Sequence, residues 1–198
     1  MDKIILLSDL WGKRNSNWIS HYVAALENHF EVIFYDCCEL AEITVVDNSQ
    51  EKIHQQFMNG GVERAVSKLL QKEIACNHIL GFSIGGLIAW KAILEGLNVE
   101  SLTTISSTRL RFEEVRPTCE INLFYAENDL FKPSLDWSLK HDLKMNIVDN
   151  ESHDFYRNQI TASLVCDEIS RRFSKTNNSS QKKMRHFRNA FSSFNIMI

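Results

Sequence analysis

Residues 81–86, GFSIGG, join a serine to three glycines in an arrangement suited to nucleophilic chemistry. The segment matches G-x-S-x-G, with an apolar run ending at Gly81 and another beginning at Ile84. At such a sharp strand-to-helix turn the serine hydroxyl is exposed above the sheet edge, and the glycines avoid clashes with neighbouring elements. A phosphate-binding loop is a weaker interpretation, because the segment lacks the lysine of the P-loop pattern. Ser83 is therefore the predicted nucleophile, the alternative being an idle serine in a glycine turn.

A serine hydroxyl is a weak nucleophile, so it needs a base, and the base needs an acid that orients it. Asp129 and His153 each follow the end of a late apolar run, so we expect them at the same sheet edge as Ser83. Glu127 is the alternative acid. His141 is the alternative base, although it lies in a helical pattern rather than after a strand.

The intermediate of acyl transfer carries an oxyanion, which two backbone N–H groups usually stabilise. Ile84, directly after the nucleophile, is expected to supply one of them. The other is expected from Leu10, in the loop SDLWG that follows the first apolar run. Trp11 in the same loop is either a pocket-lining residue or a core aromatic.

The elements that must position these residues alternate between short apolar runs and longer helical patterns. The predicted strands are Ile4–Ser8, Val32–Asp36, His78–Phe82, Leu102–Ser106, Ile121–Ala126 and Met145–Val148. The predicted helices are Ser16–His29, Gly61–Lys72, Ile84–Leu97, Ser134–His141 and Phe155–Phe173. This alternation predicts an α/β protein with a single doubly wound, mostly parallel sheet of about six strands.

Two polar segments do not fit this alternation. Residues 41–59 have no clear period and are predicted to form a loop or a short helix. After residue 173 the sequence SKTNNSSQKK is a polar linker, and the basic, aromatic remainder is either a loosely packed extension or a docking helix. We therefore expect one domain at residues 1–173 and an extension at 174–198.

Composition excludes several classes of function. The 198 residues have a formal net charge of −3, which gives no indication of binding to nucleic acid or an anionic membrane. The first residues lack the pattern of a signal peptide, and no apolar run is long enough to span a bilayer, so we expect a cytoplasmic protein. The five cysteines are odd in number and form no CxxC, which predicts reduced thiols and neither a metal site nor a cofactor.

With these motifs the chain resembles the α/β-hydrolase superfamily over about residues 3–173. The resemblance rests on IILLSDLWG, GFSIGG, the D-x-x-x-P segment 129–133 and the late His153; the DLWG loop is similar to dienelactone-hydrolase-like members. The chain departs from the family where Ser8 and Asp9 replace a frequent His-Gly. It also departs where Ala126 and Asn150 replace glycines three residues before the acid and the histidine.

Many members of this superfamily insert a helical cap after the strand that here ends near residue 106. Only residues 107–120 lie before the next strand, which is too short for a cap, so we expect an open cleft suited to bulky or carrier-bound acyl groups. Arg109, Arg111 and Arg116 cluster in this connection. They form either a solvated face or a contact with an acidic substrate or acyl-carrier partner.

The predicted function is hydrolysis of a carboxylic ester or thioester through an acyl-enzyme on Ser83. The expected partner is a small-molecule or carrier-bound acyl substrate, and a homodimer or an acyl-carrier protein contact remains open. Two alternatives are acyl transfer to an acceptor other than water and a non-catalytic binding protein on the same fold, because fold alone does not define a substrate.

Overall fold

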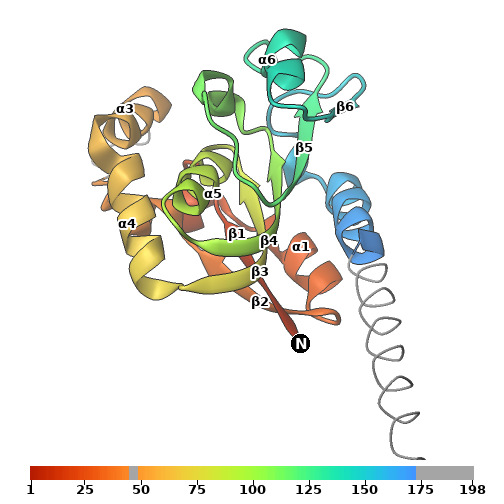
Figure 1. The fold of residues 1–198 in the computed structure, drawn as a ribbon, viewed down its shortest axis with the longest axis horizontal. Coiled ribbons are helices and arrows are strands. Elements are labelled where there is room, and N and C mark those ends of the chain that lie inside the picture. The colour runs from red at the N-terminus through yellow and green to blue at the C-terminus, as the bar shows by residue number, and fades with distance from the viewer. Residues whose placement is uncertain (45–48, 173–198) are drawn as a thin grey trace, which may run out of the picture.

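The computed structural model describes residues 1–44 and 49–172. Its centre is a six-stranded sheet in the order β2-β1-β3-β4-β5-β6, with every neighbouring pair parallel (Figure 1). The strands are β1 Asp2–Leu7, β2 Phe30–Tyr35, β3 Ala75–Phe82, β4 Asn98–Ile105, β5 Glu120–Ala126 and β6 Met145–Val148. The six predicted strands are thus confirmed, with shifts of a few residues at their ends.

Both faces of the sheet are covered, as expected for parallel strands. Successive side chains of a strand point to opposite faces, and β1 illustrates this: Ile5 and Leu7 belong to one core cluster, whereas Ile4 and Leu6 belong to the other. All four are fully buried. The sheet is therefore wound on both sides, and its centre lies inside the protein.

The helices divide between these two faces. The elements are α1 Ile19–Leu26, α2 Cys37–Ala41, α3 Gln50–Gln56, α4 Val62–Lys72, α5 Ile84–Leu94 and α6 Leu135–Lys140, with a last helix over residues 159–172. Core side chains of α1 and the last helix belong to one cluster, and those of α2 to α6 belong to the other. Figure 1 shows α1 and the last helix on one side of the sheet and α4 and α5 on the other. The short helical turns η1 Gly12–Asn15, η2 Phe57–Gly61, η3 Thr108–Phe112 and η4 Phe155–Arg157 complete the chain.

The prediction of one continuous helix over residues 155–173 was wrong. It is broken at Asn158, whose backbone is extended between η4 and the last helix. The Asn158 side chain accepts a hydrogen bond of 2.9 Å from the N–H of Thr161, so it caps the new helix. The apolar periodicity of the sequence continues across Asn158, so the pattern alone does not reveal that one helical segment ends there and another begins.

The polar segment 41–59 contains α3, which agrees with the short-helix alternative, and α2 precedes it unpredicted. Asp36 begins α2: its carboxylate accepts hydrogen bonds from the N–H groups of Cys38 and Glu39.

The C-terminal extension at 174–198 lies outside the described residues. All five cysteines are free thiols in the structure.

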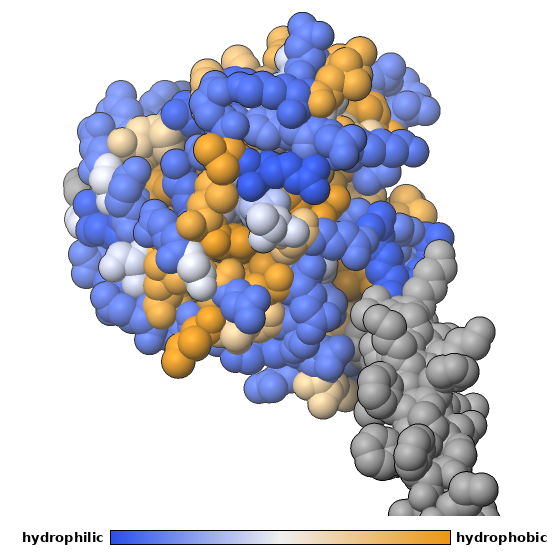
Figure 2. Space-filling model, viewed as in Figure 1, coloured by the Kyte–Doolittle hydropathy of each residue, from blue (hydrophilic) through white to orange (hydrophobic). Residues whose placement is uncertain are grey.

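The α6 end of the molecule exposes apolar surface. Leu135 and Leu139 are each 69% exposed, and Figure 2 shows hydrophobic groups at this end of the face in view. No helix in the described part of the chain combines the length and the apolar character needed to cross a membrane.

The strand order places a crevice between β1 and β3. From β1 the chain first adds β2 on one side, and then adds β3 and the later strands on the other side. Open α/β sheets bind ligands at the carboxyl ends of the two strands where the order reverses in this way. Ser83 directly follows β3 and the loop of Leu10 follows β1, so the predicted site lies at this point.

Helix α5 approaches this edge closely through Gly85. A Cβ atom at this position would lie 2.5 Å from the carbonyl oxygens of Leu7 and Ser8, both of them backbone atoms. The glycine therefore allows the start of α5 to contact the end of β1.

We expect Gly85→Ala to lower the free energy of unfolding by about 2 kcal/mol, because backbone atoms must move to admit the methyl group. Urea unfolding measures the change. Ser67→Ala at an exposed position of α4 is the control and should leave stability nearly unchanged. Equal stability of the two variants would contradict the close approach.

Candidate active site

Ser83 lies at a strained turn between β3 and α5. Its φ of 50° and ψ of −110° are unusual for a residue with a side chain. Its N–H donates a hydrogen bond of 2.8 Å to the carbonyl of Ile105, which holds the turn against β4. At Gly81 a Cβ atom would lie 2.6 Å from the backbone of Gly86, so the G-x-S-x-G glycines are required by packing. Strain kept in this way by its surroundings is typical of functional sites.

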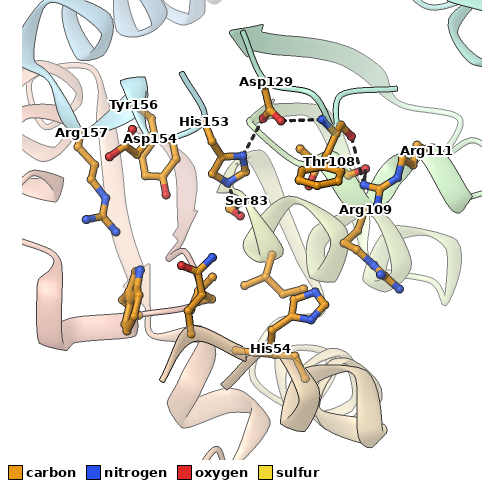
Figure 3. A pocket seen from close by; sticks show the side chains of 16 residues that line it. His54, Ser83, Thr108, Arg109, Arg111, Asp129, His153, Asp154, Tyr156 and Arg157 are labelled. Atoms are coloured by element: carbon orange, nitrogen blue, oxygen red, sulfur yellow. Dashed lines mark hydrogen bonds and ion pairs between the residues drawn. The ribbon is translucent and has the colours of Figure 1, made fainter. Parts of the chain in front are cut away.

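The three predicted side chains meet in one chain of hydrogen bonds. Ser83 Oγ lies 3.1 Å from His153 Nε2, and His153 Nδ1 lies 2.7 Å from Asp129 Oδ2 (Figure 3). Because a carboxylate only accepts hydrogen bonds, Nδ1 carries the proton and donates it. Nε2 is then free to accept the proton of the serine hydroxyl.

Asp129 is held as a carboxylate in a buried position. Its side chain is 2% exposed, and Oδ1 accepts a second hydrogen bond of 3.0 Å from the N–H of Phe131. Burial raises the pKa of Asp129, but the hydrogen bonds from His153 and Phe131 lower it further, so the pKa lies below the ordinary value. The charged form therefore persists beside the imidazole.

His153 reaches the site from the loop after β6. Asn150 has a φ of 60°, the left-handed region that asparagine adopts more readily than most residues, so it can stand where the α/β-hydrolase pattern has glycine. The Ser106 hydroxyl donates a hydrogen bond to the backbone carbonyl of His153, which anchors the loop to the end of β4. The His153 side chain is 40% exposed, so solvent reaches the imidazole.

The alternative acid and base lie elsewhere. Glu127 accepts a hydrogen bond of 2.9 Å from the N–H of Asn150 and has no contact with His153 in the described residues. His141 is buried beside Trp137, where its Nε2 lies 3.0 Å from the carbonyl of Glu113.

The predicted oxyanion donors lie beside Ser83 at the cavity wall. Leu10 and Ile84 both line the cavity that holds Ser83, and within the described residues neither N–H donates a hydrogen bond to another group. Trp11 lines the same cavity and also packs against the core, so both of its alternatives describe it in part. The donors are thus available at the site, and their role with an oxyanion stays a prediction.

The sequence did not predict the role of Asp9. Its carboxylate is fully buried and accepts three hydrogen bonds: 3.0 Å from the Trp11 N–H, 3.0 Å from the Tyr156 hydroxyl and 2.7 Å from Arg157 Nη2. Asp9 therefore fastens the loop of Leu10 to the segment just after His153. The signal for it was an acidic residue two positions after the apolar run IILL.

A cavity of about 530 Å³ opens above Ser83 (Figure 3). Its walls come from the loop after β1, from α3, from η3 and from the segments around Asp129 and His153. Arg109 and Arg111 lie in this wall, whereas Arg116 donates to the carbonyls of His141 and Asp142 outside it. The predicted arginine cluster is therefore split.

The described residues offer no metal site. Within 1–44 and 49–172, no group of three or more His, Cys, Asp or Glu side chains is placed to hold a metal ion. The residues at the cavity instead suit proton transfer and nucleophilic attack.

Comparisons with known proteins establish the fold. No protein-family model matches the chain, and no curated protein matches its sequence. Among solved structures, a Xanthomonas campestris protein assigned to the α/β hydrolase superfamily is 15% identical with a TM-score of 0.55, over 86% of this chain and 99% of that one. Est1E from Butyrivibrio proteoclasticus is 14% identical with a TM-score of 0.55, over 87% and 88%. The dienelactone hydrolase-like promiscuous phosphotriesterase P91 from metagenomic libraries is 14% identical with a TM-score of 0.59, over 78% and 72%.

We expect Asp9→Asn to lower the free energy of unfolding by about 3 kcal/mol, because Arg157 loses its buried partner. Denaturant unfolding measures this loss. Glu39→Gln is the control, since it breaks the ion pair with Lys13 on the surface, where both side chains are more than half exposed, and should change stability little. A loss no greater than that of the control would show that Asp9 does not fasten the loop.

Proposed function

From the α/β-hydrolase fold of this chain, we propose that it is a serine hydrolase that cleaves a carboxylic ester or thioester. The observation that carries the proposal is the chain of hydrogen bonds from Ser83 through His153 to the buried Asp129. Its hydroxyl end lies in a cavity that can admit a substrate. A nucleophile, a base and an orienting acid in this order are what acyl transfer requires.

In the first step Ser83 Oγ attacks the acyl carbon while His153 Nε2 takes the hydroxyl proton. The carbonyl bond opens to an oxyanion, which the N–H groups of Leu10 and Ile84 stabilise. The bond to the leaving group then breaks, and His153 returns its proton to the departing oxygen or sulfur. The acyl group is left on Ser83.

In the second step a water molecule takes the place of the leaving group. His153 accepts one proton from the water as its oxygen attacks the acyl carbon, and then donates that proton to Ser83 Oγ as the acid leaves. Asp129 keeps the imidazole in the required tautomer and stabilises its protonated form. The partial exposure of His153 is consistent with access for water.

Two observations favour hydrolysis over a non-catalytic binding role. Ser83, His153 and Asp129 are all present and hydrogen-bonded in sequence, although a binding protein has no need of this arrangement. Similar structures include one named as an esterase domain, from a Rhodothermus marinus protein.

We expect the protein to hydrolyse short-chain p-nitrophenyl esters and Ser83→Ala to lower kcat by at least about 1,000-fold, because the nucleophile is lost. Release of p-nitrophenol measures the rate. Ser67→Ala, an exposed serine on α4, is the control and should retain full activity. Turnover that survives in Ser83→Ala would contradict the proposal.

We expect protonation of Asp129 to make no contribution to the fall of kcat/KM on the acid side. Against the opposing effect of burial, the hydrogen bonds from His153 and Phe131 hold the pKa of Asp129 below its ordinary value, so the carboxylate stays ionised where the enzyme is active. A pH profile of ester hydrolysis measures the slope. A limb in which log(kcat/KM) falls with a slope of two would show that Asp129 titrates as well.

A further inference from the structure

Two arginines of η3 lie in the wall of the cavity that holds Ser83. Their guanidinium groups flank Phe112, with the Cζ atoms of Arg109 and Arg111 at 4.7 Å and 4.2 Å from the centre of its ring. Figure 3 shows both arginines across the cavity from Arg157, with His54 below Arg109.

Neither of these guanidinium groups forms an ion pair with a described residue, although the negative charge of Asp129 also acts on Arg111. Arg111 Nη1 donates to the carbonyls of Thr108 and Phe131, at 2.8 Å and 3.2 Å, which leaves its other N–H donors unused there. Arg109 makes neither a hydrogen bond nor an ion pair with any described residue. A guanidinium has five N–H donors in a planar fork that fits a carboxylate or phosphate, so both groups can bind an anion.

The arginines also repel each other and act on their neighbours. Burial and then the charge of Arg109 lower the pKa of Arg111. Burial and then both arginines lower the pKa of His54, which shares the cavity wall. An anion bound between them would relieve this repulsion.

The other charges at the cavity either have partners of their own or lie on the far side of His153. Arg157 is neutralised by its 2.7 Å contact with Asp9. Asp154 is exposed and lies next to Tyr156 in Figure 3, on the Arg157 side of His153. Asp129 is buried and bonded to His153. Positive charge without a partner is therefore concentrated at η3.

On the basis of the proposed function, we infer that Arg109 and Arg111 form an anion subsite that selects an ester or thioester carrying a carboxylate or a phosphate. Arg111 has a structural role as well, because it donates a hydrogen bond to the carbonyl of Phe131, whose N–H binds Asp129. Arg109 has no such role. Arg109→Gln is therefore the sharper test. Arg116→Gln is the matched control, since it removes the same charge from the same connection but outside the cavity.

The test compares kcat/KM for matched rigid esters. The acyl pair is p-nitrophenyl para-carboxybenzoate against p-nitrophenyl para-methylbenzoate, and the alcohol pair is the acetyl ester of para-hydroxybenzoate against para-cresyl acetate. A para-phosphono analogue of the preferred ester distinguishes a phosphate from a carboxylate. We expect one anionic ester to be preferred about tenfold or more, and Arg109→Gln to remove most of that preference, because charge-assisted hydrogen bonds are lost. Arg116→Gln should retain it.

Direct binding separates failure of the subsite from failure of the proposed function. Calorimetry with terephthalate and para-toluate on Ser83→Ala protein requires no turnover. Terephthalate should bind more tightly than para-toluate, and the addition of Arg109→Gln should abolish the difference. Equal binding of both acids, or equal kcat/KM within each ester pair, would overturn the subsite while leaving Ser83-dependent hydrolysis intact. Tight terephthalate binding without any ester turnover would instead support the subsite and contradict the hydrolase.

Discussion

The contact between Ser83 and His153 depends on one constraint: parallel strands bring their carboxyl ends to the same edge of a sheet. Ser83, Asp129 and His153 follow β3, β5 and β6, and they are far apart in sequence. No local interaction could bring them together. The central strands, buried on both faces, fix this edge, and the glycines of the elbow then let α5 approach β1 closely enough to place Ser83 at the cavity.

Much of this arrangement could be predicted from the sequence because apolar runs mark buried strands directly. The six strands and their parallel direction follow from the alternation of apolar runs and helical patterns. The contact of the three side chains follows from the strand ends and the chain order. The break at Asn158 was missed because one apolar stripe continues across it, and the unpredicted α2 depends on the cap formed by Asp36. The function of Asp9 could not be predicted, because its partners Tyr156 and Arg157 lie almost 150 positions away.

The departures from the usual family pattern are accommodated by specific contacts. Where the α/β-hydrolase pattern has glycine, Asn150 adopts the left-handed backbone that the turn before His153 needs. Asp9 gives the loop of Leu10 a buried ionic anchor to Arg157, and that anchor also ties it to the segment that carries His153. One polar network thereby couples the loop with the proposed oxyanion donor to the loop with the proposed base. Arg109 makes no hydrogen bond to the residues of this network and can vary without disturbing it, whereas Arg111 supports the backbone at Phe131.

The most direct test of the account is the reaction of folded protein with a fluorophosphonate probe, with the adduct located by mass spectrometry. Such a probe reacts with a serine whose hydroxyl is activated by a neighbouring base. We predict one adduct per chain, on Ser83, and its loss when the protein is unfolded before labelling. A folded protein that remains unlabelled while a control esterase reacts, or an adduct on another residue, would contradict it.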